Sequence, residues 1–133
     1  MPDKLLFHHV GVVCNDLDQE EATLSLLGYS RSGDDFYDPV QSVHGRFLAG
    51  QDPHLELLMP AEGSGVLSPW LSAGVKLYHL AYETCDLDGA IALLRGQNAK
   101  LLVAPVPAVA FGDRRIAFCM LKNRLLVELI ESV

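Results

Sequence analysis

The sequence predicts an α+β fold in which two tandem βαβββ modules form a single domain, residues 1–133. Three observations predict it: the chain length, an internal repeat, and the order of elements within each copy. The length suits one compact domain, because most domains have roughly 100–150 residues. We expect the modules at residues 5–60 and 76–133, joined by a linker at residues 61–75.

The repeat is clearest at the start of each copy. The stretch HVGVVCNDLD (9–18) aligns without gaps with HLAYETCDLD (79–88), and the identical positions are His9/His79, Asp16/Asp86, Leu17/Leu87 and Asp18/Asp88. Later the register holds within two residues, and the matching segments are Gly28 with Gly96, RFLAG (46–50) with IAFCM (116–120), and HLELL (54–58) with LVELI (126–130). A repeat of this kind predicts one structural unit that occurs twice.

Each copy predicts the same series of elements. A strand rich in β-branched and aromatic residues leads to an Asp that can cap a helix, and an apolar periodic segment then ends at a Gly. Three strands follow, expected near residues 29–37, 43–50 and 54–59 in the first copy and near 99–105, 114–120 and 125–131 in the second. The linker contains SPWL, which suggests a short helix with Pro69 in its first turn.

Composition excludes several classes of function. The 10 Lys and Arg against 17 Asp and Glu give a net charge of -7, which lacks the basic surface that nucleic acids require. No apolar run approaches the roughly 18 residues of a membrane span. The three cysteines (Cys14, Cys85 and Cys119) are an odd number without metal-finger spacing, as expected for reduced thiols. We therefore expect a soluble cytoplasmic protein that binds neither nucleic acid nor membrane.

Two histidines interrupt the first apolar strand, FHHVGVV (7–13). Because side chains alternate along a strand, His8 and His9 point to opposite faces. The repeat selects His9, whose counterpart is His79, whereas His8 aligns with Tyr78.

The last strand of each copy carries a Glu flanked by aliphatic residues, Glu56 in HLELLMP and Glu128 in LLVELIE. An uncompensated carboxylate there would cost several kcal/mol. A single His or Glu on an apolar strand is usually a structural or edge residue. Two of each, at matching points of a repeat, favour a shared divalent metal over the remnants of an ancestral site. Neutral imidazoles and carboxylates suit Zn, Ni, Co, Mn or Fe, and four ligands leave one or two positions open.

With these residues in place, the sequence resembles the vicinal oxygen chelate superfamily, in particular its glyoxalase I and methylmalonyl-CoA epimerase branch. The segments that carry the resemblance are HHVGVVCNDLD, HLELLMP, SPW, YHLAYETCDLDGAIALLRGQNAKLL and RRIAFCMLKNRLLVELIE. The resemblance implies the glyoxalase/bleomycin resistance/dioxygenase fold, a curved mixed sheet around a metal-binding cleft. It also implies a homodimer, and metal ligands at His9, Glu56, His79 and Glu128.

The chemistry that the resemblance implies is proton transfer next to a carbonyl, through an enediolate or enolate that the metal stabilises. The candidate base is Glu128 first and Glu56 second. An epimerase needs a further acid or base on the opposite side of the carbon. Epimerases of this kind carry a Glu just before QGV, where this chain has DPVQSVHG with Val40. Asp38, two residues earlier, is the candidate substitute.

The substrate carrier stays open. The last hairpin, CMLKNRLL, is shorter than in the epimerases, which weakens the case for CoA as the thiol. Candidates to meet an anionic substrate are Arg46, Arg114, Arg115, Lys122 and Arg124, although exposed basic residues are usually just solvated.

Our first expectation is therefore a metal-dependent lyase or isomerase of the glyoxalase or epimerase type, acting on a small thioester or thiohemiacetal. One alternative is an Fe(II) dioxygenase using His9 or His79 with Glu128, against which the fourth ligand argues. Another is a non-catalytic protein that binds drugs or other small molecules on the same fold. Such members usually lose the ligands and line the cavity with aromatic residues, whereas this chain keeps all four and is 8% aromatic.

Overall fold

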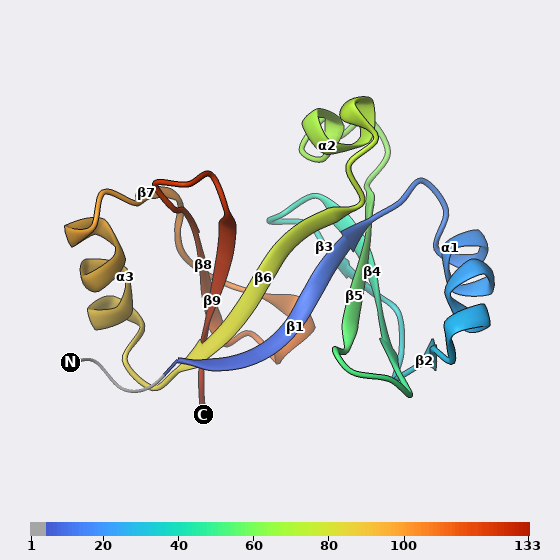
Figure 1. The fold of residues 1–133 in the computed structure, drawn as a ribbon, viewed down its shortest axis with the longest axis horizontal. Coiled ribbons are helices and arrows are strands. Elements are labelled where there is room, and N and C mark those ends of the chain that lie inside the picture. Colours follow the sequence, from blue (N-terminus) through green and yellow to red (C-terminus); the bar gives the residue numbers. More distant parts are fainter. Residues whose placement is uncertain (1–4) are drawn as a thin grey trace. The chain divides into compact units, whose positions relative to one another are not determined.

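The computed structural model describes residues 5–133; residues 1–4, at the start of the N-terminal stretch considered above, lie outside the described residues. The chain divides into two compact units, which we call the first unit (His9–Tyr78) and the second unit (Met1–His8 with His79–Val133). Strands β1 (Leu6–Val13) and β6 (Leu77–Thr84) each run across a boundary between units (Figure 1).

The first unit has the expected βαβββ order. After β1 come α1 (Leu17–Leu24), η1 (Ser25–Leu27), β2 (Ser30–Arg31), β3 (Phe36–Asp38), β4 (Val43–Ala49), β5 (Leu55–Pro60) and α2 (Ser68–Ala73). Strand β5 pairs parallel with β1 and antiparallel with β4, and β4 also pairs antiparallel with β2 and β3. The single strand expected near 29–37 is wrong, because SGDD (32–35), with Gly33 at a left-handed φ of 80°, separates β2 from β3.

The two faces of the first sheet are covered differently. Helix α1 packs on one face, where it forms a core of Val12, Cys14, Leu17, Tyr29, Leu48, Leu55 and Leu57. A separate cluster contains Val13, Val43, Leu58 and Leu67, with Trp70 and Leu71 of α2 packed against it. Because side chains alternate along β4, Leu48 faces α1 while Phe47 faces the opposite side.

The second unit repeats the arrangement. Its elements after β6 are α3 (Leu87–Gly96), β7 (Lys100–Pro107), η2 (Val109–Phe111), β8 (Arg115–Met120) and β9 (Leu126–Glu131). Strand β9 pairs parallel with β6 and antiparallel with β8, which pairs antiparallel with β7. Helix α3 covers one face of this sheet, with a core of Leu87, Ala90, Ile91, Ala117, Cys119, Val127 and Leu129. The fold class expected from the repeat is confirmed: two tandem βαβββ modules.

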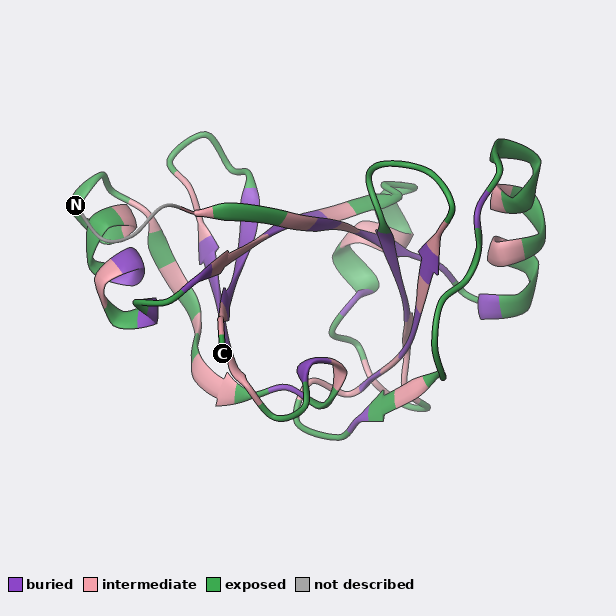
Figure 2. Cartoon of the chain, turned by 90° about the horizontal axis from the view of Figure 1, so that it is seen from below, coloured by how far each residue is buried: buried purple, intermediate pink, exposed green. Residues whose placement is uncertain are grey.

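Burial follows this helix-on-sheet packing. Figure 2 shows buried stretches on the strands, whereas α3 carries buried residues on one side and exposed residues on the other. On β8 and β9, the residues that alternate with the α3 core, including Phe118 and Glu128, face away from the helix. No helix in residues 5–133 combines the length and apolar character that crossing a membrane requires.

Both helices start at the predicted caps. Asp16 Oδ1 accepts a hydrogen bond from the N–H of Gln19 at 2.9 Å, and Asp86 Oδ1 accepts one from the N–H of Gly89 at 2.9 Å. The ends differ, because Gly28 is left-handed after η1, whereas in the second unit Asn98 takes that conformation, two residues after Gly96.

Candidate metal centre

The first unit holds a buried His–Glu pair on neighbouring strands. His9 on β1 and Glu56 on β5 share a face, since Gly11, two residues after His9, is the register partner of Glu56. The Nε2 atom of His9 lies 3.1 Å from Oε1 of Glu56, and both side chains are buried. The pair accounts for the carboxylate that sequence reasoning found out of place among aliphatic residues.

The second unit holds an equivalent pair. His79 on β6 and Glu128 on β9 share a face in the same way, because Ala81 is the register partner of Glu128. The Nε2 atom of His79 lies 3.2 Å from Oε1 of Glu128, and both side chains are buried. The small residues Gly11 and Ala81 stand at matching positions, which avoids a bulky side chain beside either carboxylate.

Each pair fits a divalent metal ion by its chemistry and its spacing. Metal bonds of about 2.1 Å, at angles between those of octahedral and tetrahedral sites, separate two ligand atoms by roughly 3.0–3.4 Å. The separations of 3.1 Å and 3.2 Å fall in this interval. A neutral imidazole with a carboxylate carries one negative charge, so two such pairs would balance the charge of a divalent ion.

An aromatic residue stands beside each pair and escaped the sequence reasoning. Phe47 is the register partner of Glu56, and Phe118 that of Glu128. The ring of Phe47 meets His9 edge-on at 5.7 Å, and the ring of Phe118 meets His79 edge-on at 5.3 Å. The alignment of RFLAG with IAFCM was therefore wrong by one residue, because it matched Phe47 to Ala117.

Asp38 lies at the end of β3, on the same face of the first sheet as Glu56. Its register partner Val43 alternates along β4 with Phe47, the partner of Glu56. The buried Asp38 carboxylate organises the turn that follows. Oδ1 accepts the N–H groups of Val40 and Gln41 at 2.9 Å and 3.1 Å, and Oδ2 accepts Nε2 of Gln41 at 2.9 Å.

The spacing along the sheet separates Asp38 from Glu56. Val43 and Phe47 are four residues apart on β4, or roughly 13 Å at strand spacing, and β3 and β5 lie on opposite sides of β4. Asp38 is therefore well placed to hold the turn containing Val40, and its role as a second base stays a prediction.

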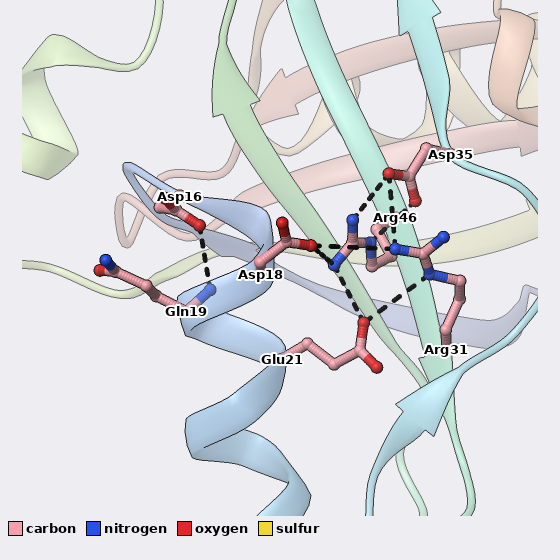
Figure 3. Close-up of polar contacts among 7 residues, drawn as sticks. All are labelled: Asp16, Asp18, Gln19, Glu21, Arg31, Asp35 and Arg46. Carbon is pink, nitrogen blue, oxygen red and sulfur yellow. Dashed lines mark hydrogen bonds and ion pairs between the residues drawn. The ribbon is translucent and has the colours of Figure 1, made fainter.

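Arg46, one of the basic residues considered for substrate binding, is engaged by acidic side chains within the first unit. Its guanidinium donates to both oxygens of Asp35 at 2.8 Å, to Glu21 at 3.0 Å, and lies 2.9 Å from Asp18 (Figure 3). Hydrogen bonding to Arg46 lowers the pKa of Asp35 below its usual value. This network ties β4 to α1.

Arg114 and Arg115 are also paired with acids. Arg114 Nη1 donates to Glu83 at 3.1 Å, and Arg115 donates to both oxygens of Glu131 at 3.1 Å and 2.7 Å. Hydrogen bonding to Arg115 lowers the pKa of Glu131. Of the five basic candidates, Lys122 and Arg124 remain without a carboxylate within ion-pair distance in residues 5–133.

Comparison with known protein families identifies the class of protein. The family model described as the Glyoxalase/Bleomycin resistance protein/Dioxygenase superfamily matches residues 8–118. The chain therefore belongs to this superfamily. Comparison with curated protein sequences finds no significant match.

Solved structures place the chain beside epimerases within this class. It is similar to a methylmalonyl-CoA epimerase of Streptomyces coelicolor, solved as a single-residue variant in complex with 2-nitronate-propionyl-CoA (26% identity, TM-score 0.79, covering 96% of this chain and 97% of that one). A methylmalonyl-CoA epimerase from Mycobacterium tuberculosis is 25% identical, with a TM-score of 0.77 over 96% of this chain and 87% of that one. A hypothetical protein from Bacillus halodurans C-125 shares the fold at 20% identity, with a TM-score of 0.81 over 98% and 96% of the two chains.

Proposed function

We propose that His9, Glu56, His79 and Glu128 together bind one divalent metal ion, and that the chain catalyses proton transfer at the carbon next to the carbonyl of a thioester or thiohemiacetal. The observation that carries the proposal is the recurrence of a buried His–Glu pair, at 3.1 Å in one unit and 3.2 Å in the other. Membership of the superfamily and similarity to epimerases at 25–26% identity support it.

The proposed chemistry divides its tasks between the metal and the side chains. When bound, the metal supplies Lewis-acid stabilisation of the negative charge that develops on the carbonyl oxygen. Glu128 is the proposed base, with Glu56 second. In each, Oε1 contacts the histidine and Oε2 is the oxygen that we assign to accept the proton. The edge-on rings of Phe47 and Phe118 exclude water beside the histidines.

Metal binding by variants tests the proposed ligands. Glu56→Gln and Glu128→Gln keep an oxygen that can accept from the histidine, so we expect the fold to persist while affinity for Co²⁺ or Zn²⁺ falls at least tenfold. Glu131→Gln, at the end of β9 and paired with Arg115, is the matched control and should bind as wild type. Equilibrium dialysis with metal analysis gives the stoichiometry. Unchanged affinity in both ligand variants would reject the proposed centre.

The reaction is tested by NMR in heavy water, with metal-loaded protein. Methylmalonyl-CoA is supplied in one sample, and methylglyoxal with glutathione in another. Deuterium at the carbon next to the carbonyl of unconverted methylmalonyl-CoA would identify an epimerase, and a lactoyl thioester would identify a lyase. If neither sample reacts, both activities are rejected, whatever the dialysis shows.

The role of Asp38 is tested in the same assay. An epimerase that uses Asp38 as its second acid or base should lose activity in Asp38→Asn, whereas a lyase should not. Gln41→Ala is the control for the turn, because it removes the side-chain donor but leaves the carboxylate in place. Equal losses in Asp38→Asn and Gln41→Ala would assign Asp38 to holding the turn.

A further inference from the structure

A cavity of about 510 Å³ opens in the second unit, beside the β8–β9 hairpin. Its lining combines three cationic side chains, one amide and two apolar side chains: Lys100, Lys122, Arg124, Asn98, Met120 and Leu121. The hairpin turn is well defined, because the N–H of Arg124 donates to the carbonyl of Leu121 at 2.9 Å and the N–H of Leu125 donates to Oδ1 of Asn123 at 3.0 Å.

The cations of this cavity are distinct from the other basic residues of the acidic chain. Five basic side chains form ion pairs with carboxylates: Arg31, Arg46, Lys76, Arg114 and Arg115. Four basic side chains in the part of the chain that the structure describes have no carboxylate within ion-pair distance, namely Arg95, Lys100, Lys122 and Arg124. Three of these four line one cavity, which concentrates positive charge there.

The cavity lies on the same face of the second sheet as Glu128. Lys100 is the register partner of Met120, which alternates along β8 with Phe118, the partner of Glu128. Helix α3 covers the opposite face, where Cys119 is buried. Lys122 follows Phe118 by four residues, roughly 13 Å of extended chain. A ligand extending along this face could reach from the base to the cations.

We propose that this cavity binds a phosphate group on the carrier portion of the substrate, remote from the reacting carbon. The role in catalysis rests on the proposed function, whereas the binding itself does not. Three cations match the charge of a phosphate or diphosphate better than that of a single carboxylate, and Arg124 adds a planar set of donors that suits phosphate oxygens. Met120 and Leu121 supply an apolar wall for the uncharged part of the carrier.

The backbone of the hairpin supports a functional reason for Arg124. Its φ of 71° lies in the left-handed region, which an Arg occupies at a cost and a Gly does not. A residue chosen for the turn alone would be Gly or Asn. An Arg at this position is consistent with selection for its side chain.

Binding to the metal-free protein tests the site separately from catalysis. Calorimetry with inorganic pyrophosphate and with coenzyme A should show saturable binding that Lys122→Gln weakens about tenfold. Arg95→Gln removes the same charge from α3, outside the cavity, and should leave binding unchanged. Absence of binding by either probe, or equal weakening by both substitutions, would overturn the proposal.

Arg124→Gly provides a second variant that does not depend on loss of folding. It should raise the melting temperature, because Gly suits the left-handed turn, and still weaken pyrophosphate binding about tenfold. Unchanged binding in this variant would reject a role for its side chain. Glutathione, which has carboxylates but no phosphate, should not compete with pyrophosphate; full competition would overturn the assignment to phosphate.

Competition between the two phosphate probes identifies the source of the phosphate. Coenzyme A should displace pyrophosphate from the wild type, and displacement should be lost in Lys122→Gln. If pyrophosphate binds but coenzyme A does not displace it, the carrier assignment is wrong. These outcomes hold even if the protein turns over neither substrate of the NMR assay, so failure of the proposed reaction and failure of this site are distinguishable.

Discussion

At the scale of single residues, the candidate metal ligands could be predicted because their chemistry conflicts with their surroundings. Glu56 and Glu128 stand among aliphatic residues, where an isolated carboxylate is costly. The accompanying Phe47 and Phe118 could not be found in the same way, because Phe is ordinary in a strand. Their separation of 71 positions also differs from the 70 of the histidines and the 72 of the glutamates. Strand pairing, absent from a sequence alignment, was needed to match them.

The three thiols are expected to differ in reactivity. Cys14 and Cys119 are buried, and burial raises the pKa of Cys14 to about 11 and also raises that of Cys119, whereas Cys85 is exposed. With Ellman's reagent at pH 8, one thiol per chain should react quickly, and three should react after unfolding. Cys85→Ser should abolish the fast phase. Three fast thiols in the native protein would contradict the buried positions.

Asp35 is expected to make stability depend on acid pH. Its folded pKa is lowered by Arg46, so its stabilisation is complete above the unfolded pKa of about 4 and is lost as pH falls through the lower folded value. Asp35→Asn should cost about 1 kcal/mol at pH 7, allowing for partial exposure, and the difference should vanish in strong acid. Urea unfolding at several pH values measures both. The neighbouring exposed Asp34→Asn should behave as wild type, and a loss of stability that persists in strong acid would contradict the ion-pair explanation.

At the scale of elements, helices were easier to predict than short strands. Asp16 and Asp86 mark helix starts because a carboxylate can accept the unpaired N–H groups of the first turn, a local interaction that sequence spacing reveals. Strands β2 and β3 exist because β4 pairs with both, a tertiary effect without a local signal. The predicted strand across residues 29–37 therefore missed the break at Gly33.

The cap of α3 gives a quantitative expectation. Asp86→Ala removes the hydrogen bond to the N–H of Gly89 and should lower the free energy of unfolding by about 1 kcal/mol. Asp88→Ala, in the first turn of the same helix but not at the cap position, should cost a few tenths of a kcal/mol at most. Thermal or urea unfolding distinguishes the two. Equal losses would show that helix charge, rather than the cap, dominates.

At the scale of the whole molecule, duplication made the fold predictable. Each unit has its own core and its own His–Glu pair, so matching residues in the two copies identified both architecture and candidate ligands. The borders of the compact units could not be predicted, because they fall at residues 8/9 and 78/79, within strands rather than loops. The homodimer implied by resemblance stays a prediction.

Metal binding is expected to stabilise both units if the proposed centre takes ligands from each. At 100 times its Kd, a metal should add about 2.7 kcal/mol to the free energy of unfolding. Hydrogen exchange should slow on both β5, which carries Glu56, and β9, which carries Glu128. In Glu128→Gln the effect should be lost at that metal concentration. Protection confined to one strand would indicate a site within a single unit.

The division of β1 between units limits how the duplicated gene can be cut. Leu5 packs against the core beneath α3, and the ring of Phe7 meets that of Tyr82 at 5.5 Å, although both precede the whole first unit in the chain. A fragment that starts after the linker would lack these contacts and leave apolar surface uncovered. Separately expressed halves would therefore exchange an N-terminal segment, and the second half should become soluble when a peptide of residues 1–8 is restored to it.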